Sequence, residues 1–205
     1  MTLLILSMAF IAMLVIANIL SVKIVSLGSW VVDVGIIAYP ITFLLSDTIS
    51  EVFGKNTAKN VIRSAFLINL FVIFLVFIAV KIQPADIWSG QPAFQEILGA
   101  APRIMIASMI AYLVSQHHDI YAFHFWKKMT KGKHLWFRNN ASTIVSQGID
   151  SIIFVLIAFW GIYENNVLFS MIMTNFILKV VFAISDTPLI YLLVGLIRKT
   201  EKKAL

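Results

Sequence analysis

Residues 61–82 read VIRSAFLINLFVIFLVFIAVKI, an almost unbroken apolar run bounded by charge at each end. A helix needs about 20 mainly apolar residues to cross the hydrocarbon layer of a membrane, and this run meets that requirement. Five further stretches have the same character, so the sequence predicts six transmembrane helices. The expected spans are residues 3–24, 31–50, 61–82, 102–125, 143–163 and 167–197.

The composition of the whole chain agrees with this interpretation. Of its 205 residues, 60% are hydrophobic and only 13% are charged, and the mean hydropathy is +0.92. Ordinary soluble domains are about 25% charged. Six spans with short connections occupy nearly all of the chain, so we expect one all-α transmembrane domain over residues 1–205 and no soluble catalytic domain. The sequence has no Cys, which excludes disulfides, thiolate metal sites and cysteine nucleophiles.

The positive charges predict the orientation. Lys and Arg gather between spans two and three, between spans four and five, and at the C-terminal end. Because such residues concentrate on the cytoplasmic side, both termini and the two basic loops should be cytoplasmic. The net charge of +6 therefore reflects topology, and we expect no nucleic-acid partner.

Two segments are expected to depart from simple spans. Residues 83–101 contain Pro84, Gly90 and Pro92, and they predict either a re-entrant or interfacial cover or a plain loop. The last span is long, and Pro188 is its expected breaking point. Residues 3–20 have no basic segment before them, so we expect a retained span and not a cleaved signal peptide.

Polar residues inside the spans carry the functional signal. An ionisable group at membrane depth costs about 2.5–3.5 kcal/mol, so such groups should face a space lined by protein. On helical wheels the polar residues of three spans form stripes, each on one face. The stripes are Phe43, Asp47, Ser50 and Glu51 in span two; Ser108, Tyr112, Ser115, Gln116 and Asp119 in span four; and Asn139, Thr143, Ser146, Gln147, Asp150 and Phe154 in span five.

Span six contains Lys179, which needs a negatively charged partner within the membrane. The candidates are Asp47, Asp119, Asp150 and Asp186. The pair could hold helices together or bind a substrate, and a transporter could use it for both. Asn18 and Ser21 in span one are as well explained by hydrogen bonds between helices.

The histidines do not predict a metal site or an enzyme. His117 and His124 share a helix face that Asp119 does not share, and two ligands are fewer than a zinc site needs. A hydrolase using His117, His118 and Asp119 is a less favoured alternative, since no His-Glu-x-x-His or Gly-x-Ser-x-Gly motif is present. No phosphate-binding Gly-rich loop occurs either. We expect a non-enzymatic protein without a cofactor.

Several motifs resemble the queuosine precursor transporter family. They are Pro40–Asp47 (PITFLLSD), Glu51–Gly54 (EVFG), Pro102-Arg103, Gln116–Asp119 (QHHD), Arg138–Asp150 (RNNASTIVSQGID), Lys179 and Asp186-Thr187-Pro188. The resemblance implies import of 7-cyano- and 7-aminomethyl-7-deazaguanine, precursors of a modified tRNA base, across the bacterial inner membrane. It also implies kinship with vitamin-uptake proteins of six helices, some of which use a partner ATPase.

The polar stripes suit such a base. A carboxylate can accept hydrogen bonds from N1–H and the exocyclic amine of a deazaguanine, and an amide or Lys can meet its carbonyl oxygen. The expected substrate-binding residues are Phe43, Asp47, Tyr112, Gln116, Asp119, Asn139, Thr143, Gln147, Asp150, Lys179 and Asp186. The aromatic residues, Phe182 included, could stack on the base or simply pack. Alternatives are another small heterocycle or vitamin, a partner ATPase, and a purely structural membrane subunit. The oligomeric state, a homodimer included, stays open.

Overall fold

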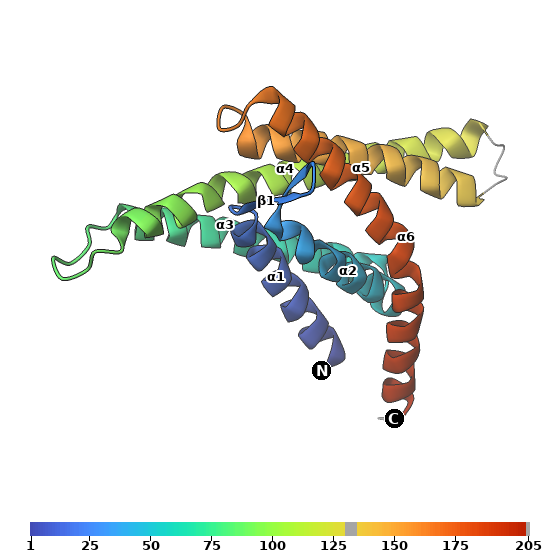
Figure 1. Ribbon diagram of the computed structural model, residues 1–205. Helices are drawn as coiled ribbons and strands as arrows, with labels where there is room; N and C mark the ends of the chain where they lie inside the picture. The colour runs from blue at the N-terminus through green and yellow to red at the C-terminus, as the bar shows by residue number, and fades with distance from the viewer. Residues whose placement is uncertain (130–134, 204–205) are drawn as a thin grey trace. The chain divides into compact units, whose positions relative to one another are not determined.

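A computed structural model describes residues 1–129 and 135–203. It does not describe the side chains of residues 119–120, 123–124, 126–127, 135–143, 183–184, 186–188, 198 and 200–203. The described chain is mostly helical (Figure 1). Its elements are α1 (Thr2–Leu20), β1 (Ile24–Leu27), β2 (Trp30–Asp33), the 3-10 helix η1 (Val34–Ile37), α2 (Tyr39–Phe53), α3 (Lys55–Lys81), α4 (Gln91–Met129), α5 (Leu135–Phe159) and α6 (Asn165–Lys203).

Several helices have the length and composition of membrane spans. Among the described residues, four helical segments qualify, and α5 adds a shorter apolar helix at Ile144–Phe159. The four segments are Thr2–Leu20, Lys55–Lys81, Gln91–His118 and Asn165–Phe182. The chain is therefore a helical, multi-pass membrane protein.

Between α1 and α2 the structure differs from the predicted spans. We expected span one to reach Ile24 and span two to begin at Val31, but a two-stranded hairpin of β1 and β2 lies there, followed by η1. Gly28 has a φ of 67°, a left-handed conformation that glycine adopts without strain and that suits a tight hairpin turn. The β-branched residues on both sides favour strands. Pro40 lies in the first turn of α2, where its missing N–H costs no helical hydrogen bond.

The proline-based predictions for α4 and α6 also need correction. Residues 91–101, expected to be part of a cover or loop, form the first turns of α4, which continues through Pro102. Pro92 lies in the first turn of that helix, where proline is tolerated. Likewise α6 does not break at Pro188, because a helix of 39 residues can lose one backbone hydrogen bond and continue.

Contacts along the chain define two compact units, which are described separately. The first unit comprises Met1–Val25, Asp33–Met105 and Val181–Leu205, and the second comprises Ser26–Val32 and Ile106–Val180. In the first unit, α1, α2 and α3 pack around Phe10, Leu45 and Ala65. Asn18 on α1 donates to Asn69 on α3 with 3.4 Å between Nδ2 and Oδ1. This bond agrees with the interhelical role considered for Asn18.

The second unit combines α5 with parts of α4 and α6 and the tip of the hairpin. Gly148 on α5 lies against the ring of Phe176 on α6, so a small residue there permits close packing of the two helices. The hairpin tip is tied to α6 by the Val31 backbone N–H, which donates to Ser170 Oγ at 3.2 Å. These contacts join α6 both to α5 and to the tip of the hairpin.

Polarity is distributed in the way that a lipid environment requires. Leu70, Phe71 and Phe74 on α3 are exposed, whereas the neighbouring Asn69 is fully buried. Exposed apolar side chains on a membrane-length helix face lipid, and polar side chains are placed where other protein groups can meet them. On α4, α5 and α6 as well, polar side chains such as Ser115, Asp150 and Lys179 are buried. They form the site described below.

The joint between α2 and α3 gives a stability prediction. Gly54 has φ 88° and ψ 157°, a region that only glycine enters easily. We expect Gly54→Ala to cost about 1–3 kcal/mol and to lower the Tm of the detergent-purified protein. Gly99→Ala, on a helix with open space around the added methyl group, is the matched control and should leave the Tm unchanged or raise it. Equal Tm values for both variants would contradict this role of Gly54.

Candidate functional site

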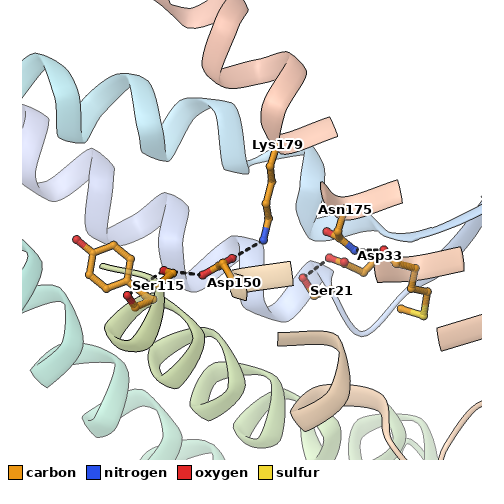
Figure 2. A network of polar contacts seen from close by, with 8 residues as sticks. Ser21, Asp33, Ser115, Asp150, Asn175 and Lys179 are labelled. Atoms are coloured by element: carbon orange, nitrogen blue, oxygen red, sulfur yellow. Dashed lines mark hydrogen bonds and ion pairs between the residues drawn. The ribbon is translucent and has the colours of Figure 1, made fainter. Parts of the chain in front are cut away.

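The candidate site is built around Lys179, whose side chain is only 1% exposed. Its Nζ lies 2.6 Å from Oδ2 of Asp150 on α5. Figure 2 shows the lysine extending from α6 to the Asp150 carboxylate. Of the four carboxylates considered as partners for Lys179, the structure therefore places Asp150 in direct contact.

The second oxygen of the same carboxylate contacts a third helix. Ser115 Oγ on α4 lies 3.3 Å from Asp150 Oδ1 and also 3.1 Å from the Tyr112 carbonyl oxygen (Figure 2). Asp150 thus links α4, α5 and α6 through its two oxygens. Since one buried carboxylate holds two partners, its orientation is fixed by both.

An aromatic ring also lies near the ammonium group. Lys179 Nζ lies 5.6 Å from the ring centroid of Phe154, one turn after Asp150 on α5. A cation at this distance is attracted by the electrons of the ring face. Phe154 in turn meets Phe159 edge to face, with 5.9 Å between centroids. The site therefore offers a negative group, a positive group and an aromatic face.

Unused hydrogen-bonding capacity lies beside the ion pair. Among the described residues, Gln147 Oε1 and Ser151 Oγ are buried polar atoms without a hydrogen-bond partner. At 100° per residue, Gln147 projects between Asp150 and Ser151 on α5, so the three side chains share one arc of the helix. Buried polar atoms normally have partners. This side of α5 can therefore accept and donate further bonds.

The other predicted residues on α4 have varied surroundings. Tyr112 is half-buried, while Gln116 and His117 are exposed. His117 Nδ1 lies 3.1 Å from the Leu113 carbonyl oxygen of its own helix. His118 Nδ1 lies 3.3 Å from Ser146 Oγ on α5, which adds a second contact between these helices. In the described part of the chain, no cluster of three or more His, Cys, Asp or Glu side chains could hold a metal ion.

Three predicted residues, Phe43, Asp47 and Asp186, belong to the first unit, and the side chains of the first two are described. Phe43 is half-buried on α2 and meets Tyr39 edge to face at 5.2 Å between centroids, and Asp47 is exposed on the same helix. The side chains of Asp119, His124, Asn139, Thr143 and Asp186 lie outside the described residues. For four of these residues, a role in substrate binding stays a prediction, whereas none was predicted for His124.

One buried acid, Asp33, was not among the residues predicted from the sequence. Asp33, at the end of β2, is 2% exposed, and its Oδ1 lies 2.6 Å from Ser21 Oγ. It is the only charged residue between Lys23 and Asp47 in the sequence, and this isolation within an apolar stretch was the available signal.

Comparison with known proteins shows which family the chain belongs to. A family model described as "Putative vitamin uptake transporter" matches residues 33–193. The chain belongs to this vitamin uptake transporter family. The matched range includes Ser115, Asp150 and Lys179, so the ion pair lies within the part of the chain that matches the family.

Two curated relatives of the chain carry a more specific name. The chain is 28% identical over 189 residues to the "Probable queuosine precursor transporter" of Bacillus subtilis (strain 168), covering 92% of this chain and 82% of that one. It is 25% identical over 126 residues to the "Queuosine precursor transporter" of Escherichia coli (strain K12), covering 62% of this chain and 54% of that one. No solved structure matches the chain.

The buried ion pair gives a test of coupling between its members. Lys179→Met or Asp150→Asn leaves one charge buried without its partner, which we expect to cost about 3–5 kcal/mol. The double variant removes both charges and should recover most of that loss. Denaturation of the detergent-purified protein measures the three changes. Losses that simply add in the double variant would show that the two groups are not coupled.

Proposed function

We propose that this chain imports queuosine precursors, the 7-deazaguanine bases, across the bacterial inner membrane. Membership of a transporter family and the names of two relatives support the proposal. The observation that carries it is the Asp150–Lys179 pair, which places a carboxylate and an ammonium group side by side in a membrane protein. Each charged group raises the free energy of a membrane-embedded protein, so a role in substrate binding explains why the chain contains both.

The base is chemically complementary to this pair. On its pyrimidine edge, N1–H and the amine are donors that a carboxylate accepts together, and the adjacent carbonyl oxygen can accept from Lys179. The edge of the base thus offers each charged group a replacement for its present partner. Binding would therefore offset part of the interaction energy that is lost when the ion pair opens, because each charged group keeps a polar contact.

Neighbouring side chains supply the remaining interactions. Gln147 and Ser151 have unused polar atoms beside Asp150, and Phe154 and Tyr112 provide rings near the same helices. Aromatic rings suit the flat faces of a base. We include Phe43, Asp47, Gln116, Asp119, Asn139, Thr143 and Asp186 as further candidate contacts, on the strength of their polar stripes in the sequence.

For the topology we propose six spans in one transmembrane domain, with both termini cytoplasmic. The long apolar segments of α1, α3, α4 and α6 and the shorter one of α5 support five of them. The proposed sixth is α2 (Tyr39–Phe53), whose 15 residues are extended at the N-terminal end by η1. The excess of Lys and Arg in alternate connections supports the orientation.

A second candidate substrate is a vitamin-like heterocycle, which the description of the family model favours. The two candidates differ at the edge that meets Asp150 and Lys179. A ligand without adjacent donors for the carboxylate would leave Asp150 without compensation when the ion pair opens. Competition by unlabelled vitamins against a labelled deazaguanine distinguishes the two.

The central experiment measures uptake of labelled 7-cyano- and 7-aminomethyl-7-deazaguanine in cells that cannot make these bases. Expression of the chain should restore uptake, and Asp150→Asn and Lys179→Met should each reduce it. Each variant removes hydrogen bonds to a charged group, worth about 1.5–3 kcal/mol. This loss corresponds to about a tenfold or larger fall in uptake at low substrate concentration.

Matched controls for this experiment are Glu164→Gln and Lys81→Met, which make the same chemical changes at exposed positions. Both should retain uptake. If Asp150→Asn and Lys179→Met are expressed normally and also retain it, the site is wrongly placed. If the unaltered protein gives no uptake, the substrate is wrongly assigned.

The unused polar atoms give a separate prediction. Replacing a buried polar group that lacks a partner is neutral or stabilising. We therefore expect Gln147→Leu and Ser151→Ala to leave the Tm unchanged or raised, and yet to weaken substrate binding. Ser64→Ala, an exposed serine on α3, is the control for both measurements. Unchanged affinity in both α5 variants would show that these atoms do not contact the substrate.

A further inference from the structure

The two oxygens of Asp150 lie in different surroundings, and this difference gives the proposed binding site a direction. Oδ2 lies 2.6 Å from the ammonium group of Lys179, whereas Oδ1 lies 3.3 Å from the hydroxyl oxygen of Ser115. Figure 2 shows the Asp150 carboxylate between these two side chains. A cation therefore lies at one end of the carboxylate, and a neutral hydroxyl group lies at the other.

The pyrimidine edge of a 7-deazaguanine has a direction as well. Its carbonyl oxygen is an acceptor, the neighbouring N1–H is a donor, and the exocyclic amine at the far end has two further hydrogens to donate. When the carbonyl oxygen meets Lys179, N1–H meets Oδ2 of Asp150 and the amine meets Oδ1. The reverse orientation sets the amine beside the ammonium group, and both of these groups are donors. The first orientation is therefore the favoured one.

In that orientation Ser115 lies beside the exocyclic amine. Its Oγ is 3.1 Å from the Tyr112 carbonyl oxygen on the same helix, a shorter distance than the one to Asp150. The hydroxyl hydrogen can stay with the Tyr112 carbonyl oxygen, and neither contact uses the two lone pairs of Oγ. The amine can therefore donate one hydrogen to Asp150 Oδ1 and the other to Ser115 Oγ.

Burial makes such a contact selective. Ser115 is 6% exposed and Asp150 is 5% exposed, so water has little access to either side chain. A base without the amine would turn a C–H group toward both acceptors. A site built to hydrogen-bond one group of a substrate discriminates strongly against an analogue that lacks this group, because the polar atoms of the site then lose their partner.

We propose that Ser115 is a specificity-determining residue that recognises the exocyclic amine of the substrate and so selects guanine-type over hypoxanthine-type bases. This inference rests on the proposed transport function, because it takes a deazaguanine as the ligand of the Asp150–Lys179 pair. Each side chain then recognises one part of the base. Lys179 meets the carbonyl oxygen, Asp150 accepts from N1–H and the amine, and Ser115 accepts the second hydrogen of the amine.

The test measures binding of two ligands to the full-length protein purified in detergent, 7-cyano-7-deazaguanine and its analogue without the amine. The unaltered protein should bind the first at least about tenfold more tightly, because the amine donates to a charged oxygen. Ser115→Ala should reduce this preference by about fivefold, the value of one hydrogen bond between uncharged groups. Ser115→Cys should reduce it as well, because a thiol is only a weak acceptor.

The ratio of the two affinities is the decisive readout, since a change in helix packing alone weakens both ligands equally and leaves the ratio unchanged. The control is Ser185→Ala, which should retain the ratio. Ser185 is an exposed serine that also bonds to its own helix, with 2.8 Å between its Oγ and the Val181 carbonyl oxygen.

Two kinds of contrary result can be told apart. A full preference that survives in both Ser115 variants, or an unaltered protein that binds the two ligands equally, overturns the role of Ser115 and leaves the proposed import intact. An unaltered protein that neither binds nor imports a deazaguanine overturns the import proposal and this inference with it.

Discussion

The energetic cost of charge inside a membrane governs this structure. Moving a carboxylate or an ammonium group out of water costs several kcal/mol even after the protein relaxes, and Lys179 and Asp150 meet that cost by contacting each other at 2.6 Å. The contact requires α5 and α6 to lie together, and the second oxygen of Asp150 adds α4 through Ser115. Packing of the second unit and the chemistry of the candidate site therefore have the same origin.

The two buried acids differ in their surroundings. Asp150 is neutralised by the ammonium group of Lys179, which lies 2.6 Å from its Oδ2. Asp33 accepts a hydrogen bond from the hydroxyl group of Ser21, with 2.6 Å between the oxygens. The two acids belong to different units, and each is buried within its own unit.

Much of the fold was predictable because hydropathy reports directly on lipid contact. The apolar run at residues 61–82 matches the greater part of α3, and Lys179 within an apolar segment required a carboxylate partner. The polar stripe that contained Asp150 followed from helical periodicity. Hydropathy cannot distinguish an apolar hairpin from a span, so β1, β2 and η1 were missed. The partner of Lys179 could not be chosen among four acids, because wheels show which face a residue occupies but not which helix it meets.

The lengths of α4 and α6 carry a mechanical consequence. Each has 39 residues, or about 58 Å at 1.5 Å per residue, against a hydrocarbon layer of about 30 Å. Transmembrane helices tilt by up to about 40°, which does not take up the difference. Both helices must therefore extend beyond the hydrocarbon layer, and Lys128 and Lys199 near their C-terminal ends are exposed. A small change in the tilt of such a helix would displace its projecting end further than the part that lies within the bilayer.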